Sequence, residues 1–191
     1  MNELVQIVNN LDNKAKDIYE KEMKISEEKE EKEKIRLRKE KRKDLEEFKK
    51  IAKEGFEKVK QIENIVEYEN IVDISKIIGA YFQTQGVNTT KIRKFLDAVR
   101  KLQAEINKKS PSDKEKENKD LRLEILMLKP KIAYTAAKHK QLKPFVKIIN
   151  HFIDEVYNNS SPNFIDRNSF QKLVYFIESI VAYHRFYGGK D

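Results

Sequence analysis

Apolar residues recur every three to four positions along most of the chain, which is the spacing of helices that bury one face. Two such runs lie in the first third of the sequence, over residues 2–25 and 45–66, and both fit a heptad repeat. They comprise Leu4, Ile7, Val8, Leu11, Ala15, Ile18 and Ile25, followed by Leu45, Phe48, Ala52, Val59, Ile62 and Val66. Gly55 interrupts the second run. The two seams can fold back on each other as a hairpin or meet another subunit, and the pattern allows both.

The segment between the two runs has a different character. From residue 26 to residue 43 only Ile35 and Leu37 are apolar, among alternating Lys, Arg and Glu. Ion pairs between residues four apart can keep such a segment helical without any packing. We therefore expect residues 26–43 to form a solvated helix or to be partly disordered.

Beyond residue 70 the pattern predicts a set of amphipathic helices. The first ends at Gly86, in the place where a left-handed residue is usual. The second begins at Thr89, whose hydroxyl can cap the first turn, and runs to about residue 107. The apolar stripes of these two helices are Ile71, Ile74, Ile77, Ile78, Tyr81 and Phe82, and then Ile92, Phe95, Leu96, Val99, Leu102 and Ile106.

A third helix is expected from about Ser112, where Ser112 and Glu115 have the spacing of a capping box. Its stripe is Leu121, Ile125, Leu128, Ile132 and Ala136. Pro130 lies inside this stripe, and its missing N–H and its ring cost about 3 kcal/mol in a straight helix, so the sequence predicts a kink there. Pro144 ends this helix or starts the next.

The last two helices complete the set. One has the inward stripe Phe145, Ile148, Ile149, Phe152 and Val156. Asp166 can cap the other, and Gly188-Gly189 closes it. The stripe of this final helix is Phe170, Leu173, Ile177, Ile180, His184 and Tyr187.

Composition agrees with an all-α fold. Charged residues make up 38% of the 191 residues, while five Gly and four Pro are too few for an architecture of strands and turns. The expected fold is a small helical bundle over residues 69–191 with a long, charged helical extension over residues 1–68. With no Cys there are no disulfides, and with neither a signal peptide nor a long apolar run we expect a soluble, cytoplasmic protein without membrane contact.

Positive charge is concentrated in one part of the chain. Residues 87–147 hold 17 cations against 7 anions, whereas the whole chain carries a net charge of +8. Lys94, Lys101 and Lys108 are seven apart, and Arg93 and Arg100 form a second row beside them. Further along, an aromatic residue lies between two cations, in the order Lys131, Tyr134 and Lys138. Such a face can contact sugar-phosphate and stack on a base, although a tyrosine at the edge of the core between two solvated lysines fits the spacing equally well.

The residue types of catalytic and metal sites are not in usable patterns. His139, His151 and His184 lie too far apart for a local metal motif, and there is no glycine-rich phosphate loop or Gly-x-Ser-x-Gly turn. We expect no enzymatic activity, no cofactor and no small-molecule substrate. His184 lies on an apolar stripe and is interpreted as a packed histidine, and Glu178 as a structural partner of a cation, with Arg93 as the candidate.

Three segments, taken in order, resemble a known family. They are TTKIRKFL at residues 89–96, LKPKIAYTAAKH at 128–139 and FIESIVAYHRFYGGK at 176–190. Together they resemble the small subunit of type III-A CRISPR interference complexes, the Csm family, over about residue 71 to the C-terminus. Two features depart from this family: Lys138 stands where the family tends to have Arg, and the Lys/Glu-rich segment before residue 71 exceeds the usual N-terminus.

The resemblance implies a non-catalytic helical bundle that is present in several copies and forms one filament of a ribonucleoprotein. Its partners would be guide RNA, target RNA, the other subunits and further copies of itself. By position, the resemblance implicates basic residues of the first two segments in backbone contacts: Lys91, Arg93 and Lys94, then Lys129, Lys131 and Lys138. With the spacing arguments above, the candidate RNA-binding set also includes Arg100, Lys101 and Tyr134. The candidate structural residues are Thr89, Pro130, Glu178 and His184.

A second reading remains open from the sequence alone. The heptads of the first 66 residues are also typical of a coiled-coil interaction or dimerisation protein, in which the basic face would be incidental.

Overall fold

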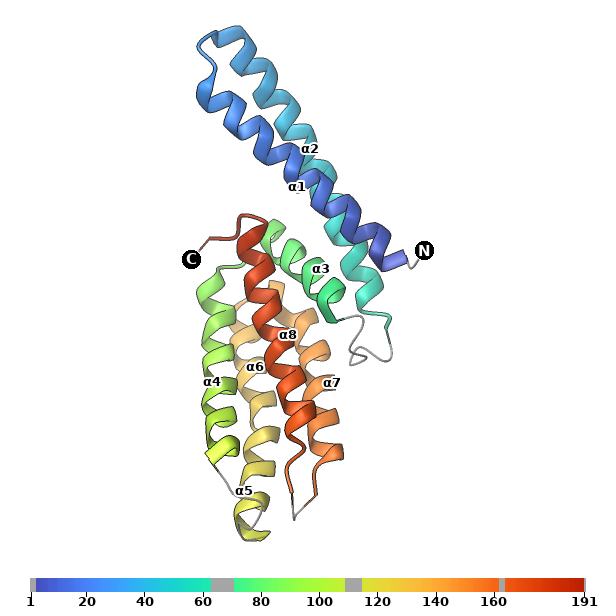
Figure 1. Cartoon of the computed structure of the whole chain (residues 1–191), viewed down its shortest axis with the longest axis vertical. Helices are drawn as coiled ribbons and strands as arrows, with labels where there is room; N and C mark the ends of the chain where they lie inside the picture. Colours follow the sequence, from blue (N-terminus) through green and yellow to red (C-terminus); the bar gives the residue numbers. More distant parts are fainter. Residues whose placement is uncertain (1–2, 63–70, 109–114, 162–163, 191) are drawn as a thin grey trace.

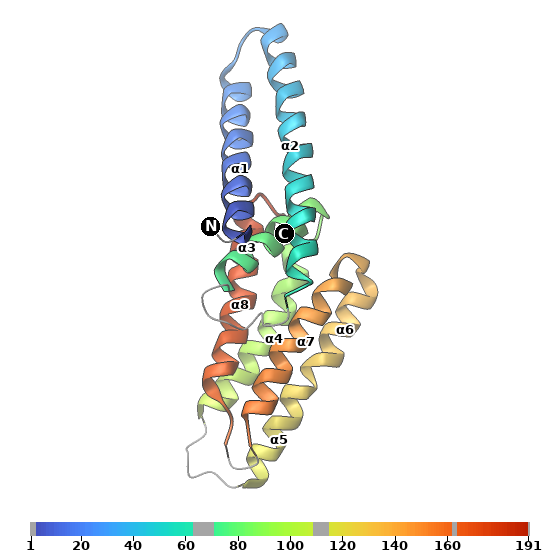
Figure 2. The ribbon, with the colours of Figure 1, turned by 90° about the vertical axis from the view of Figure 1, so that its right-hand side faces the viewer.

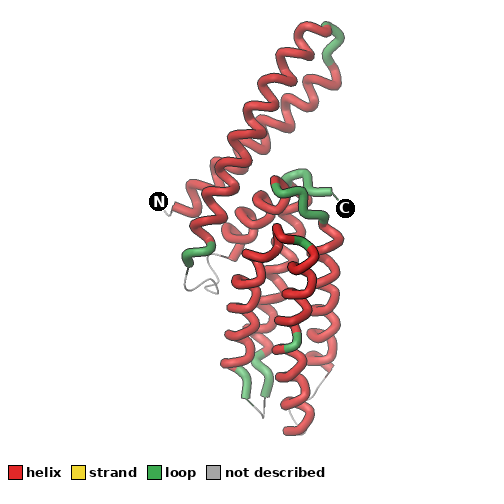
Figure 3. Tube along the Cα trace, turned by 180° about the vertical axis from the view of Figure 1, so that it is seen from behind, coloured by secondary structure: helices red, strands yellow, loops and turns green. Residues whose placement is uncertain are grey.

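The computed structural model describes residues 3–62, 71–108, 115–161 and 164–190. Its first two helices, α1 (Glu3–Glu27) and α2 (Glu31–Val59), run antiparallel as a hairpin arm, and the next, α3 (Ile71–Thr84), lies between this arm and the rest of the molecule (Figure 1). Regular structure in the described residues is helical throughout, except for one isolated antiparallel bridge between Ser161 and Phe164 (Figure 3). The expected all-α fold with a long helical extension is therefore confirmed.

The remaining helices form an antiparallel bundle. In chain order they are α4 (Thr89–Lys108), α5 (Glu115–Leu126), α6 (Leu128–Lys138), the 3₁₀ turn η2 (Lys140–Leu142), α7 (Lys143–Asn159) and α8 (Arg167–Phe186). Around the bundle α4 packs against α6, α6 against α7, α7 against α8, and α8 again against α4 (Figures 1 and 2). The chain runs down α4, up α5 and α6, down α7 and up α8, so the start of α4 and the end of α8 lie at the end of the bundle nearest the arm.

The predicted apolar stripes of α4, α5–α6, α7 and α8 are buried at every predicted position, His184 and Tyr187 included. On α3 the same holds except for Tyr81, which is half-buried and stacks on Phe56 of α2 with ring centroids 4.0 Å apart. The buried side chains of the arm, of α3 and of the bundle form one continuous apolar cluster. The boundary expected near residue 68 falls in 63–70, outside the described residues.

The two heptad seams meet within one chain. Leu4, Val8 and Leu11 of α1 are buried with Phe48 and Ala52 of α2, so the hairpin alternative is the one that the molecule adopts (Figure 1). Residues 31–43 form the first half of α2. Of the two alternatives for the charged segment, the solvated helix is therefore correct for this part, although Leu37 does pack into the hairpin.

Gly55 lies where α2 contacts both α1 and α3. A Cβ atom at this position would lie 2.9 Å from Cγ2 of Ile7 on α1 and 3.0 Å from Cγ2 of Ile77 on α3. The missing side chain lets three helices approach one another, which heptad counting along one helix cannot reveal.

A buried carboxylate joins the two helices of the arm. Asp44 of α2 accepts hydrogen bonds from Lys14, at 3.2 Å, and from Lys21, both on α1. Burial by itself raises the pKa of Asp44, but the hydrogen bonds and charges of the two lysines outweigh it and hold this pKa below its usual value. The ionised form of Asp44 is therefore the one that stabilises the hairpin.

Helices α3 and α8 cross in close contact at Gly79. A Cβ atom on Gly79 of α3 would lie 2.7 Å from the backbone nitrogen of His184 and 2.9 Å from the backbone carbonyl carbon of Tyr183. Only glycine leaves room for two backbones at this separation. Beside the crossing, Asp12 of α1 accepts from Lys76 Nζ of α3 at 2.8 Å and from the hydroxyl of Tyr187 at 2.7 Å. Arm, linking helix and bundle thus meet at one place.

The last residues of the chain hold the start of α4. The Thr89 hydroxyl donates its proton to the Lys190 carbonyl at 2.9 Å. Nδ1 of buried His184 lies 2.9 Å from the same hydroxyl oxygen. Because the hydroxyl has only one proton, His184 is the donor in this second hydrogen bond. The backbone N–H of Thr89 donates to the same carbonyl. Gly189 lies so close to the His184 ring that a side chain there would overlap it. The interpretation of His184 as a packed histidine is confirmed.

Thr89 is not the cap that the sequence indicated. Asn88 fills that role, because its side-chain oxygen accepts from the Thr90 N–H at 2.8 Å, while the Thr89 hydroxyl points into the core. Three other predicted helix ends are confirmed: Gly86 and Gly188 have φ of +63° and +89°, and Asp166 caps α8 through the N–H groups of Asn168 and Ser169.

The helix irregularity expected at Pro130 lies three residues before it, at Met127, whose backbone angles stay in the right-handed helical region. The predicted third helix divides at Met127 into α5 and α6, and Pro130 lies in the first turn of α6, where its missing N–H has no helical partner to lose. Pro144 similarly lies at the start of α7, so it begins that helix. The capping box expected at Ser112 lies outside the described residues.

The glycine crossing generates a prediction about stability. We expect Gly79→Ala to lower the free energy of unfolding by about 1–3 kcal/mol, because two backbones must separate. Gly55→Ala should cost clearly less, since its Cβ meets only the ends of isoleucine side chains and alanine favours the helix by roughly 1 kcal/mol. Thermal unfolding of both variants measures this difference, and equal losses would contradict the account of the crossing.

The Asp44 cluster generates a prediction about pH. A carboxyl group whose pKa is lower in the folded than in the unfolded protein stabilises the fold at a pH above its unfolded-state pKa, which is about 3.9 for Asp. This contribution is lost as the pH falls toward the folded-state pKa. We expect Asp44→Asn to lose roughly 1–3 kcal/mol at pH 7. The difference from wild type should shrink below about pH 4.

Melting temperatures between pH 7 and pH 3 provide the measurement. Asp17→Asn is the matched control, since this exposed carboxylate lies 3.8 Å from Lys14 and should matter little at any pH. A loss at Asp44 that is independent of pH would show that packing and not charge is responsible.

Candidate nucleic-acid interface

The basic residues of α4 lie on two different sides of the helix. Arg93 and Arg100 face α8, where they line a shallow hollow together with Glu178 and Arg185. Arg100 Nε donates to Glu178 Oε1 at 3.0 Å, and Nη2 lies 2.9 Å from the same oxygen. Glu178 is thus an ion-pair partner, as expected. Its donor is Arg100. Arg93, which the sequence indicated as the partner of Glu178, lines the same hollow.

Lys129 also has a structural contact. It forms an ion pair and hydrogen bond with Asp154 of α7, so this side of α6 faces α7. Lys129, Arg93 and Arg100 therefore do not share a surface with the rest of the predicted RNA-binding set. Lys129 and Arg100 form ion pairs with carboxylates of neighbouring helices, and Arg93 faces α8.

The other candidates converge where α4 and α6 pack side by side. Lys131 and Lys138 lie about 160–180° around α6 from Lys129, and hence toward α4. Lys91 lies about 160° around α4 from Arg93, and hence toward α6. Tyr134 and Lys94 are exposed next to them. We call this surface the α4–α6 face and define it by Lys91, Lys94, Lys131, Tyr134 and Lys138.

The pKa of His139 reflects this convergence. His139 follows α6 directly, and its pKa is lowered by partial burial first and then by the charges of Lys91 and Lys138. A charge on α4 and a charge on α6 can act on one imidazole only if both lie near it, so the two helix ends join in one positive surface. Sequence reasoning singled out His139 only as an unlikely metal ligand and had no signal for this position.

Tyr134 is the aromatic part of the face. Its side chain is 65% exposed, and Lys138 Nζ lies 4.5 Å from the ring centroid. The ring is therefore not at the edge of the core, which was the alternative explanation of its spacing. An exposed ring with a cation over it offers both stacking and charge to a ligand. Lys101, two turns after Lys94 on the outer side of α4, is also exposed.

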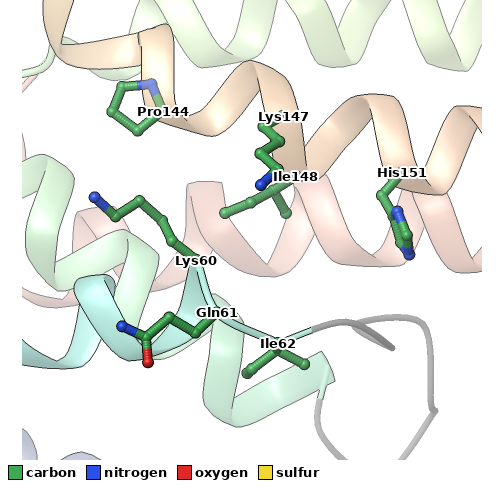
Figure 4. Close-up of a pocket in the computed structure, with 7 residues that line it drawn as sticks. All are labelled: Lys60, Gln61, Ile62, Pro144, Lys147, Ile148 and His151. Atoms are coloured by element: carbon green, nitrogen blue, oxygen red, sulfur yellow. The ribbon is translucent and has the colours of Figure 1, made fainter.

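A separate basic hollow lies between the end of α2 and the first half of α7 (Figure 4). It measures about 490 Å³ and is lined by Lys60, Gln61, Ile62, Pro144, Lys147, Ile148 and His151. Lys60 already forms an ion pair with Glu57 at 2.5 Å. Because the lining comes from the residues that follow α2 and from α7, this hollow is not part of the α4–α6 face.

Two further classes of site have no counterpart in the parts of the chain that the structure describes. No helix there is both long and apolar enough to cross a membrane. Nor do three or more His, Asp or Glu side chains gather there in a group that could hold a metal ion.

Comparison with known proteins gives a family. The model of the family described as Csm2 Type III-A matches residues 65–190, about two thirds of the chain and all of the bundle helices. Neither the curated proteins nor the solved structures yield a match. The matched region contains α3, the α4–α6 face and the residues that hold the start of α4, while the hairpin arm lies before it. The chain therefore belongs to the Csm2 Type III-A family and is a subunit of a type III-A CRISPR complex.

Proposed function

We propose that this subunit is a non-catalytic RNA-binding scaffold, which contacts guide RNA and target RNA through the α4–α6 face. Several copies would lie along the RNA beside the other subunits of the complex. The observation that carries the proposal is the convergence of four lysines and one exposed tyrosine, from two helices, on one face within the region that matches the family.

The chemistry of the face suits a backbone ligand. Lysine is a flexible point charge that binds phosphate without the directional fork of arginine, so four lysines favour contacts that do not depend on base sequence. Tyr134 can stack on any base, because every base has a π-face. Arg100 and Lys129 form ion pairs with Glu178 and Asp154 and lie outside the α4–α6 face. The cations of that face are therefore all lysines.

The alternative function, that of a coiled-coil interaction protein, was suggested by the two heptad seams. Both heptad seams are used inside one hairpin, so they are not available as an intermolecular coiled coil without opening it. A dimer through another surface remains compatible with the scaffold role.

The proposal predicts a specific salt dependence. If three to five phosphates are neutralised, the logarithm of the affinity for single-stranded RNA should fall with the logarithm of salt concentration with a slope of roughly −2 to −3.5. The triple variant Lys94→Ala, Lys131→Ala and Lys138→Ala should reduce the magnitude of this slope by about 2 and should weaken binding similarly for all sequences. Fluorescence anisotropy at several salt concentrations measures both effects.

The matched control is a triple variant of the arm, Lys39→Ala, Lys43→Ala and Lys50→Ala. These lysines are exposed on the outer side of α2, and replacing them removes the same amount of positive charge as the first triple variant. Circular dichroism should show that both variants fold, with stability within about 0.5 kcal/mol of wild type. If both triple variants lose binding equally, only net charge matters and the α4–α6 face is not the binding site.

The non-catalytic role is tested separately. We expect labelled RNA to stay intact when it is incubated with the purified protein, both with Mg²⁺ and with a chelator. Cleavage that persists through purification and disappears when a single carboxylate is replaced by its amide would contradict the scaffold function.

A further inference from the structure

The arm extends past the end of the bundle, and its underside is the continuation of the side that contacts the bundle (Figure 1). On α1 this side is marked by Asp12, which contacts Lys76 of α3 and Tyr187. Tyr19 and Met23 are 7 and 11 residues further, rotated from Asp12 by only about 20° in either direction, and they lie roughly 10 and 16 Å further out. Tyr19 is 64% exposed and Met23 45% exposed.

On α2 the same side is marked by Phe56, which stacks on Tyr81 of α3. Arg38 is 18 residues before Phe56, which is five full turns, and so lies on the same side of the helix about 27 Å further out. Arg42 is rotated from that direction by about 40°. Both arginines are exposed, and Arg38 has one contact of 3.6 Å with Glu31, also exposed. An exposed pair of this kind holds an arginine only weakly.

The end of α8 meets the arm at the inner end of this stretch, where Tyr187 also donates to Asp12. Tyr187 contacts Phe48 of α2 with ring centroids 5.5 Å apart, and the ring of Phe186 packs edge-on against Tyr187 at 5.2 Å. Phe186 is nevertheless 67% exposed. By helix rotation, the corner between the underside of the arm and the end of α8 presents two arginines, a methionine and a tyrosine on its arm side. On its α8 side it presents the exposed ring of Phe186.

We propose that this corner, defined by Tyr19, Met23, Arg38, Arg42 and Phe186 and called the overhang, is a second contact for single-stranded RNA. The inference rests on the proposed function and extends the binding surface from the bundle to the arm, which lies outside the region that matches the family. Aromatic rings and a methionine offer stacking to bases, while the arginines offer bidentate contacts to phosphate.

The position of the overhang favours RNA as its occupant over a second protein. Lys91 of the α4–α6 face lies in the first turn of α4, at the end of the bundle nearest the arm (Figure 1). A strand that lies along the α4–α6 face therefore leaves the bundle toward the overhang. The arginines also suit a polyanion, since a protein partner would need a matching acidic and apolar surface.

The test uses a single-stranded RNA of about 30 nucleotides, longer than the roughly 4–16 nucleotides that one binding surface occupies. Variant Arg38→Ala with Arg42→Ala removes the charge of the overhang. Its matched control is Lys39→Ala with Lys43→Ala, one residue further along the same helix and rotated by about 100° and 140° from the side of Phe56. Tyr19→Ala removes the ring, and Tyr175→Ala removes a similarly exposed ring of α8 as its control.

We expect the arginine variant to reduce the magnitude of the log–log salt slope by about 1.4, and its lysine control to leave the slope nearly unchanged. Tyr19→Ala should weaken binding at least about five-fold, the lower end of what stacking of one base contributes, and Tyr175→Ala should not. Thermal unfolding confirms that all four variants fold.

Three results would overturn the inference, and they differ in what else they affect. If the triple variant of the α4–α6 face loses binding while the overhang variants behave as their controls, the inference fails and the proposed function stands. If wild type shows no salt-dependent RNA binding, the proposed function fails and the inference with it. If the overhang variants bind RNA normally but no longer assemble into the CRISPR complex, the corner is a protein contact.

Discussion

The close approach of α3 and α8 is the constraint on which the rest of the molecule depends. At Gly79 the two backbones come so near that even a methyl group would overlap the chain at Tyr183 and His184. This contact fixes the direction of α3, and α3 in turn carries the arm. Asp12 of α1 orients the arm further, because its carboxylate accepts hydrogen bonds from Lys76 of α3 and from Tyr187 at the end of α8. A packing contact and a polar contact together set the angle between arm and bundle.

The same end of the bundle determines where the basic face begins. His184, which belongs to the α3–α8 crossing, also donates to Thr89, and the chain turns back after Gly188 so that Lys190 accepts from Thr89. The rotation of α4 about its axis is thereby fixed at its first residue. Lys91 then faces α6, whereas Arg93 and Arg100 face α8. The side of the bundle that each of these cations reaches is therefore set by its rotation about the axis of α4.

Within this family the arm is the part that sequence comparison leaves unexplained, since the match begins at residue 65. The structure gives it a physical basis: a hairpin closed by heptad seams and by the buried charge cluster around Asp44. The arm, with exposed aromatic and basic residues on its underside, extends the surface of the subunit beyond the bundle.

The sequence by itself determined the helices, their buried stripes and most of their ends, because helical periodicity, capping chemistry and left-handed glycines act over a few neighbouring residues. It also brought Lys91, Lys131, Tyr134 and Lys138 into consideration. Only the tertiary structure decided which of the candidate cations share a surface, that Arg100 and Lys129 form ion pairs across helices, and that Asn88 is the cap that frees Thr89 for the core. It also decided that the seams pair within one chain and that Gly79 is needed for the close packing of α3 on α8. Each of these depends on the rotation and spacing of helices far apart in sequence, which residues along one helix do not specify.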